Sequence, residues 1–122
     1  MVKWMVLFHE DFDSEFEALP EEVQDEMLAH AKLLERFGPQ LGRPRVDTLN
    51  GSRHANMKEL RFEAADGVWR VAFDPKRRAI LLSAGDKSGL GGRRFYKQLI
   101  AKADRRFDSH LARLEKERKH KP

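Results

Sequence analysis

The sequence predicts an α+β domain with the element order βααβββα, in which two N-terminal helices and a long C-terminal helix pack on a mainly antiparallel four-stranded sheet. Two patterns carry this prediction. Residues 57–73 alternate apolar and polar side chains on either side of a turn signal, whereas residues 11–34 and 93–119 repeat apolar side chains every three or four positions. A chain of 122 residues is long enough for one hydrophobic core. We therefore expect a single domain over residues 1–122, with residues 116–122 as a frayed basic tail.

The N-terminal third predicts one strand followed by two helices. Residues 3–9 (KWMVLFH) are rich in Trp, Val, Leu and Phe, as in a buried strand. Phe12 and Phe16 lie four positions apart and begin a first helix. A second helix starts at Leu19-Pro20-Glu21-Glu22, because Pro is tolerated in the first turn and acidic side chains favour the positive end of the helix dipole. Gly38-Pro39 ends this helix.

The segment that follows predicts a long connection. Residues 38–56 (GPQLGRPRVDTLNGSRHAN) concentrate Gly, Pro, Asn and Ser. Connections longer than about 12 residues are uncommon in domains and often functional. This segment is therefore a candidate binding loop.

Three strands are expected at residues 57–64, 68–73 and 79–85. Asp66-Gly67 between the first two is a strong hairpin signal. The third strand, AILLSAG, is apolar on both faces, as expected of a central strand. A last helix follows over residues 93–119. We expect the helices to cover one face of the sheet and to leave the other face free.

The composition excludes several kinds of site. The chain has no cysteine, so disulfides, thiolate metal sites and cysteine nucleophiles are absent. Its five histidines lack a metal-ligand spacing, and we expect no metal and no cofactor. No apolar run reaches about 18 residues, and the N-terminus is not typical of a secretory signal. We therefore expect a cytoplasmic protein with no membrane segment.

The net charge of +4 conceals a strong polarity along the chain. Counting Lys and Arg against Asp and Glu, residues 1–37 carry 3 and 10 (−7), residues 38–86 carry 9 and 6 (+3), and residues 87–122 carry 12 and 4 (+8). The basic C-terminal part suits a polyanionic partner, although a solvated basic helix explains the same pattern.

Arg61 and Arg70 lie in the middle of the two strands that flank the expected turn. A two-residue turn at Asp66-Gly67 would place Glu63 opposite Arg70, whereas a four-residue loop would place Arg61 opposite Arg70. Both geometries put the two arginines on one face. We expect this to be the uncovered face, because burying unpaired guanidinium groups is costly. Two guanidiniums suit a phosphate ligand, whereas a Glu63–Arg70 contact would be a plain surface ion pair.

The second half of the chain contains, in this order, the segments HANMKELRF, DGVWRVAF, AILLSAGDKSG and RRFYKQLIAKADRRF. This set resembles toxins of bacterial type II toxin–antitoxin systems, in the RelE/ParE superfamily and close to its HigB branch. The similarity covers nearly the whole chain. It implies a RelE-like fold and a cytoplasmic toxin that cleaves messenger RNA on the ribosome without a metal. It also implies a cognate antitoxin, usually a helix-turn-helix protein.

The resemblance further implies a catalytic site on the sheet. In RelE-like nucleases a cluster of Arg and Lys, often with a tyrosine near the last helix, acts on the scissile phosphate. The matching positions in this sequence are Arg61, Arg70, Lys58, Lys87 and Tyr96. The RNA or the ribosome is expected to contact Arg53, His54, Arg77, Arg78, Arg93 and Arg94.

The nucleophile in such a reaction is the 2′-hydroxyl of the RNA. The general base is expected to be Lys58 or Lys87 with a pKa lowered by neighbouring cations, or Glu59 on the same face as Arg61. No histidine stands at the end of the last strand. A histidine-based acid–base pair, which some members of the superfamily use, is therefore not indicated.

Two other functions remain open. ParE-like members of the superfamily poison DNA gyrase, and a protein of that kind would block supercoiling while translation continues. A non-catalytic module that binds RNA or the ribosome through its basic helix would bind with strong salt dependence and give no cleavage product.

Overall fold

The strands form one mixed sheet in the computed structural model, which describes residues 4–75, 78–89 and 91–120. In this part of the chain the elements are β1 (Val6–Phe8), α1 (Glu10–Glu17), α2 (Glu21–Phe37), the 3₁₀ helix η1 (Gly38–Gln40), β2 (Val46–Thr48), β3 (Lys58–Ala64), β4 (Gly67–Asp74), β5 (Ala79–Asp86) and α3 (Gly92–His120). The strand order is β1-β5-β4-β3-β2. β1 is parallel to β5, and the other neighbours are antiparallel. None of the described helices combines the length and the apolar character needed to cross a bilayer.

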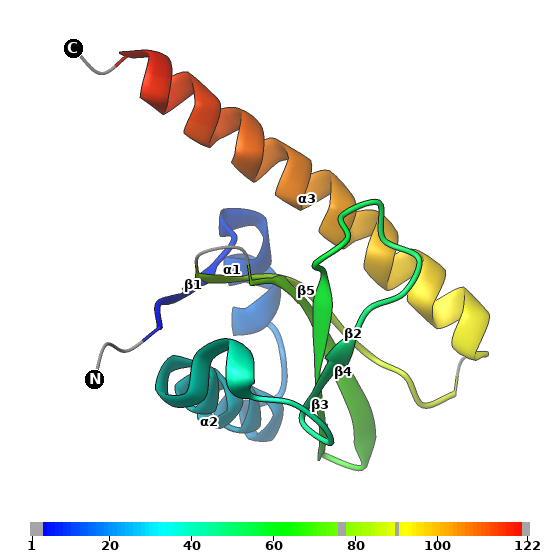
Figure 1. Ribbon diagram of the computed structural model, residues 1–122. Helices are drawn as coiled ribbons and strands as arrows, with labels where there is room; N and C mark the ends of the chain where they lie inside the picture. Colours follow the sequence, from blue (N-terminus) through cyan, green and yellow to red (C-terminus); the bar gives the residue numbers. More distant parts are fainter. Residues whose placement is uncertain (1–3, 76–77, 90, 121–122) are drawn as a thin grey trace.

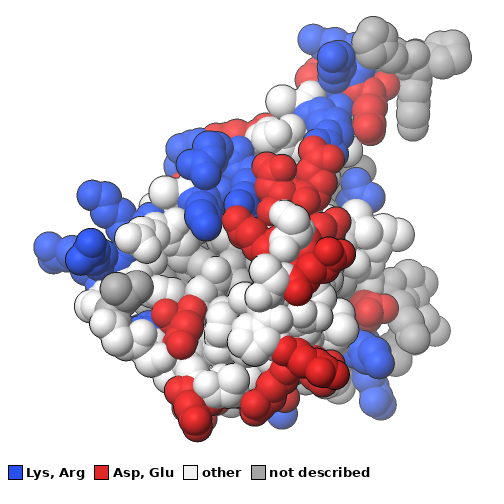
Figure 2. Space-filling view, turned by 180° about the vertical axis from the view of Figure 1, so that it is seen from behind, with Lys and Arg blue, Asp and Glu red and all other residues white. Residues whose placement is uncertain are grey.

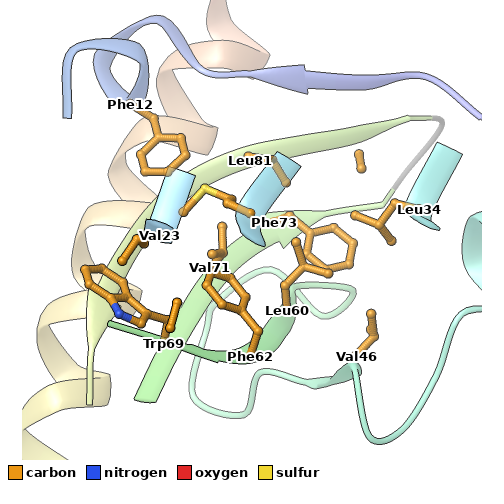
Figure 3. Packing of buried hydrophobic residues seen from close by; sticks show 13 residues of the cluster. Phe12, Val23, Leu34, Val46, Leu60, Phe62, Trp69, Val71, Phe73 and Leu81 are labelled. Atoms are coloured by element: carbon orange, nitrogen blue, oxygen red, sulfur yellow. The ribbon is translucent and has the colours of Figure 1, made fainter. Parts of the chain in front are cut away.

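Helices cover both faces of the sheet (Figure 1). α1 and α2 lie on one face, where their apolar side chains pack against the sheet (Figure 3); this cluster includes Phe12, Val23, Met27, Leu34, Leu60, Phe62, Val71 and Phe73. α3 runs across the other face, where a second cluster includes Ala72, Ile80, Leu82, Phe95, Leu99, Ala103 and Phe107. The α+β class is confirmed, but the prediction of a free face was wrong. The apolar stripe of α3 needs a sheet surface of its own.

The sheet has one strand more than the sequence predicted. β2 lies within residues 38–56, which we expected to be a connection, and pairs with β3 at the sheet edge. Its Val46 is 3% exposed and lies opposite Leu60. The prediction of four strands in the order βααβββα was therefore wrong in both number and order, because a strand of three residues is too short to show an alternating pattern. β3, β4 and β5 lie where three strands were expected, and α3 continues through the expected tail to His120.

The β3–β4 turn consists of Ala65 and Asp66, not of Asp66-Gly67. Ala64 pairs with Gly67, and the two turn residues have φ values of 50° and 60°. Positive φ at both central residues is the geometry of a type I′ hairpin turn. Glycine at position 67 leaves room for two side chains, because a Cβ there would lie 2.7 Å from Asp86 Oδ2 and 2.8 Å from Trp69 Nε1. As a result of this register, Arg61 faces Arg70 and Glu63 faces Val68.

A buried guanidinium joins α3 to α1 and β5. The Arg106 side chain is 8% exposed and donates to both carboxylate oxygens of Glu15, at 2.8 and 2.6 Å. It also donates to the Leu82 carbonyl at 2.8 Å. The Arg106 hydrogen bond lowers the pKa of the Glu15 carboxyl, although burial opposes it. Arg106 therefore depends on Glu15 for its counter-charge.

We expect Glu15→Gln to lower the free energy of unfolding at pH 7 by about 1–3 kcal/mol, towards the lower end because solvent screens the part-exposed Glu15. Because the folded-state pKa of Glu15 is lowered, its stabilisation is complete above the ordinary carboxyl pKa and is lost as the pH falls through the lowered value. Urea unfolding at neutral and acid pH measures this. Glu17→Gln, at an exposed position of the same helix, is the control. An equal loss at both pH values would contradict the ion pair.

Candidate functional site

A cluster of Glu59, Arg70 and the half-buried Tyr96 lies between the sheet and the first turns of α3. Glu59 and Arg70 are 6% and 8% exposed. The Tyr96 hydroxyl donates to Glu59 Oε1 at 2.7 Å, and Arg70 Nε lies 3.3 Å from the same oxygen. That short contact is an ion pair and not an aligned hydrogen bond, since Arg70 Nε has no hydrogen-bond partner among the described residues. Arg70 Nη1 donates instead to the Trp69 carbonyl at 2.9 Å. Glu59 therefore holds a phenol and a guanidinium in place.

The surroundings of Tyr96 keep its phenol protonated. Burial, and then the hydrogen bond to the Glu59 carboxylate, raises the pKa of Tyr96, while Arg70 opposes the shift. Lys87 Nζ lies over the Tyr96 ring, 5.3 Å from its centroid, which is the distance of a cation–π contact. The backbone N–H of Lys87 donates to the Val68 carbonyl at 2.6 Å and fixes this residue beside the ring. The cluster thus brings together a phenol, a guanidinium and an ammonium group.

Gly85 allows α3 to approach the sheet at this point. It pairs with Arg70 across the β4–β5 ladder, and a Cβ at this position would lie 2.9 Å from Phe95 Cε1. Phe95 precedes Tyr96 and packs edge-on against it, with ring centroids 5.2 Å apart. The sequence alone did not indicate this role, because a glycine in a strand shows a close approach only once its neighbour is known.

Arg61 lies opposite Arg70 at the border of the cluster. Its side chain is 34% exposed, and its Nη1 lies 3.6 Å from Asp47 Oδ2 on β2. Asp47 is shared with Arg43, whose Nε lies at 3.2 Å. The backbone N–H of Thr48, with smaller contributions from Arg43 and Arg61, lowers the pKa of Asp47. Each of the two strand arginines therefore has a carboxylate partner.

The prediction that both arginines project from an uncovered face was wrong. α3 covers Arg70, whose burial is tolerated because Glu59 supplies the counter-charge. Arg61 remains partly exposed. The placement of Lys58 beside the arginines was also wrong, since alternation along β3 puts it on the α2 face with Leu60. Of the predicted catalytic residues, the structure brings together Arg61, Arg70, Lys87 and Tyr96.

Arg53 and His54 are held against the middle of α3. Both side chains contact the Asp108 carboxylate, with His54 Nε2 at 2.8 Å from Asp108 Oδ1. The neighbouring Ser52 hydroxyl donates to Asp104, also on α3. These contacts attach the loop to α3, so the polar groups of Ser52, Arg53 and His54 have a structural role. No group of three or more His, Asp or Glu side chains in the described ranges could hold a metal ion.

Arg93 and Arg94 are the predicted RNA contacts that lie nearest the cluster. Both are exposed in the first turn of α3, just before Tyr96. Cations at the N-terminus of a helix oppose the helix dipole, so helix stability does not explain them. Arg78 instead lines a hollow beside the C-terminal half of α3, away from the cluster. Arg77 lies outside the described residues.

The charge polarity of the sequence is also visible on the surface. Figure 2 shows Lys and Arg side chains gathered over α3, including its N-terminal end at the left of the view. Asp and Glu side chains occupy much of the lower part of the same view. The basic C-terminal part of the sequence is therefore a basic surface along α3.

Comparisons with known proteins identify relatives over most of the chain. It is 46% identical over 101 residues to "Putative toxin HigB2" and 44% identical over 97 residues to "Putative toxin HigB3", both of Mycobacterium tuberculosis. Each alignment covers 80% of this chain, but 49% of the first relative and 84% of the second, so the chain spans about half the length of the first. No solved structure matches. The model of the phage-derived Gp49-like proteins (DUF891) matches residues 14–108, and the chain belongs to this family.

Proposed function

We propose that this chain is the toxin of a type II toxin–antitoxin system, of the RelE/ParE superfamily, and that it cleaves messenger RNA on the ribosome without a metal ion. Similarity to two proteins named as toxins supports the first part. The observation that carries the second is the Glu59–Arg70–Tyr96 cluster, with Lys87 over the phenol ring. The protein then acts in the cytoplasm, and its partner is a cognate antitoxin of the helix-turn-helix type.

The cluster suits a transesterification in which the RNA supplies the nucleophile. The 2′-oxygen bonds to the adjacent phosphorus, and the bond from phosphorus to the next 5′-oxygen breaks, leaving a 2′,3′-cyclic phosphate and a 5′-hydroxyl. The 2′-hydroxyl proton passes to the Tyr96 oxygen while the phenol proton passes to Glu59, 2.7 Å away. The Lys87 ammonium protonates the departing 5′-oxygen. Arg61 donates to the phosphate oxygens, and Arg70 adds positive charge beneath them.

A non-catalytic RNA-binding module is the second candidate. The pairing of Arg70 with Glu59 and of Arg61 with Asp47 favours it, because both guanidiniums already have carboxylate partners. For cleavage, the RNA phosphate must take the place of Asp47 beside Arg61. As a binding module the chain would attach to ribosomal RNA, with affinity falling steeply as salt rises, and would leave the message intact.

Toeprinting of a message on programmed ribosomes distinguishes these functions. We expect the wild-type chain to cut the message on ribosomes and not free in solution. Arg61→Gln is expected to slow cleavage about tenfold, which raises the activation free energy by about 1.4 kcal/mol, because one donor to the phosphate is lost. Asp47 keeps its ion pair with Arg43 in this variant. Arg113→Gln, at an exposed position near the far end of α3, is the matched control. Binding without cleavage at any codon would establish the second candidate. A block of gyrase supercoiling during normal translation would instead indicate a gyrase poison.

A further inference from the structure

The C-terminal half of α3 extends beyond the sheet (Figure 1). Its apolar side chains nevertheless continue at spacings of four and three, from Phe107 to Leu111 and Leu114. Phe107 is buried against the sheet, whereas Leu111 and Leu114 are only half-buried. The apolar stripe of α3 is therefore longer than the sheet surface that it covers.

A hollow of about 790 Å³ lies beside this part of α3. The apolar part of its lining consists of Met5 and Ile80, from the sheet side, and of Phe107, Leu111 and Leu114. Ile80 and Phe107 are both 4% exposed and form the floor, whereas Met5 is 54% exposed. The hollow is therefore an apolar surface that is open to solvent at its rim.

The charged groups around the hollow have both signs. Arg78 and Arg118 supply two guanidiniums, whereas Glu115 and Glu117, together with the buried Asp74, supply three carboxylates. Figure 2 shows the same mixture of charges on the projecting end of α3, at the upper right of the view. The carboxylates would repel a polyanion such as RNA, although most of α3 is basic. The rim therefore suits a protein partner that also carries both charges.

Arg78 and Glu117 are available for such a partner. Neither forms an ion pair within the described part of the chain. Both lie near His110, because burial and then the Arg78 charge lower the pKa of this histidine, while Glu117 opposes the shift. His110 is therefore neutral at pH 7 and adds no third cation to the rim.

A second copy of the chain has the required pattern. In a dimer with two-fold symmetry the same surface meets itself, so it must carry its own complementary charges. If two α3 helices cross antiparallel between Leu111 and Leu114, each Leu111 faces the Leu114 of the other copy. The same symmetry places position 110 opposite 115 and position 108 opposite 117. Arg78, beside His110, then lies near Glu117 of the second copy.

We propose that this hollow is the interface of a symmetric homodimer, in which Leu111 and Leu114 of each copy enter the hollow of the other. Arg78 of each copy pairs with Glu117 of the other. The dimer does not depend on the proposed function. Tyr96 lies about 22 Å along α3 from Leu111, at about 1.5 Å per residue, so the interface leaves both copies of the candidate site open.

Sedimentation equilibrium of the purified chain, without any antitoxin, tests the dimer. We expect the mass to rise with concentration from that of one chain to that of two. Leu114→Glu is expected to raise the dissociation constant of the dimer at least about tenfold, because it places a carboxylate in the apolar contact. Leu28→Glu makes the same change at a leucine of α2 that is 42% exposed and lies outside the hollow, and is expected to leave the constant unchanged.

Two charge reversals test the orientation of the copies. Arg78→Glu alone and Glu117→Arg alone each place like charges opposite one another, and each is expected to raise the dissociation constant about threefold to tenfold. An equal mixture of the two variants is expected to recover wild-type association, because opposite charges again face each other. A mixture that associates as weakly as each variant alone overturns the proposed arrangement.

Other results would also overturn the dimer. A chain that stays monomeric up to about 1 mM does so directly. In that case, loss of ribosome binding in Arg78→Glu would identify RNA as the occupant of the hollow, and loss of antitoxin binding in Leu114→Glu would identify the antitoxin. Equal weakening by Leu114→Glu and Leu28→Glu would place the contact elsewhere. If Leu114→Glu does not fold, the mixture of charge variants decides.

Discussion

Tyr96→Phe is expected to lower the rate of ribosome-dependent cleavage by about 10²–10³-fold. The substitution removes the hydroxyl that connects the RNA 2′-hydroxyl to Glu59 and keeps the ring that packs on Phe95 beneath Lys87. Single-turnover cleavage on programmed ribosomes measures the effect. The free energy of unfolding should fall by only about 1 kcal/mol, because Glu59 keeps its contact with Arg70.

Ser83→Ala is the matched control for this loss of a hydroxyl. The Ser83 hydroxyl donates to the Leu99 carbonyl at 3.0 Å and so joins the same helix to the same sheet, outside the cluster. Its removal should leave the cleavage rate unchanged. A Tyr96→Phe protein that cleaves as fast as Ser83→Ala would contradict the proton relay through Tyr96.

Glu59→Gln is expected to lower the free energy of unfolding by about 3–5 kcal/mol, because the buried guanidinium of Arg70 loses its counter-charge. Urea unfolding at neutral pH measures the loss. Glu63→Gln, on the same strand and the same face but exposed, should change stability by less than about 0.5 kcal/mol.

The double variant Glu59→Gln/Arg70→Met identifies the cause of that loss. It removes both charges of the buried pair, so no buried charge is left without a partner, and the Gln amide at position 59 still accepts from the Tyr96 hydroxyl. We expect it to regain most of the stability that Glu59→Gln loses. A double variant as unstable as the single one would show that packing, and not the unpaired charge, causes the loss.

The fold was predicted best where a periodic pattern extends over many residues. α2, α3 and strands β3 to β5 repeat their apolar residues often enough to be recognised. β2 has three residues between Pro44 and Asn50 and shows no such pattern. The apolar character of AILLSAG on both faces was compatible with helices on both sides of the sheet. Assigning all helices to one face overlooked this signal.

The sequence identified most residues of the site, but not how they are arranged in space. The sequence placed Arg61 and Arg70 on one face, and the type I′ turn made them direct neighbours. Alternation along β3 already placed Lys58 on the opposite face, so its inclusion was avoidable. The burial of Arg70 was not predictable, because it depends on Glu59 and on a tyrosine that α3 brings from far along the chain.

A β-bulge interrupts β5 at Leu82, the extra residue between the Ala72–Ser83 and Phe73–Leu81 pairs. Before it, Leu81 faces α2 and Ile80 faces α3; after it, Ser83 bonds to α3 and Ala84 packs towards α2. Deleting Leu82 would remove the bulge and leave Ser83 and Ala84 on their present faces. Inserting a residue between Ser83 and Ala84 would instead move Ala84 to the place where Gly85 now leaves room for α3. Related chains should therefore accept a deletion at this point of β5 more readily than an insertion.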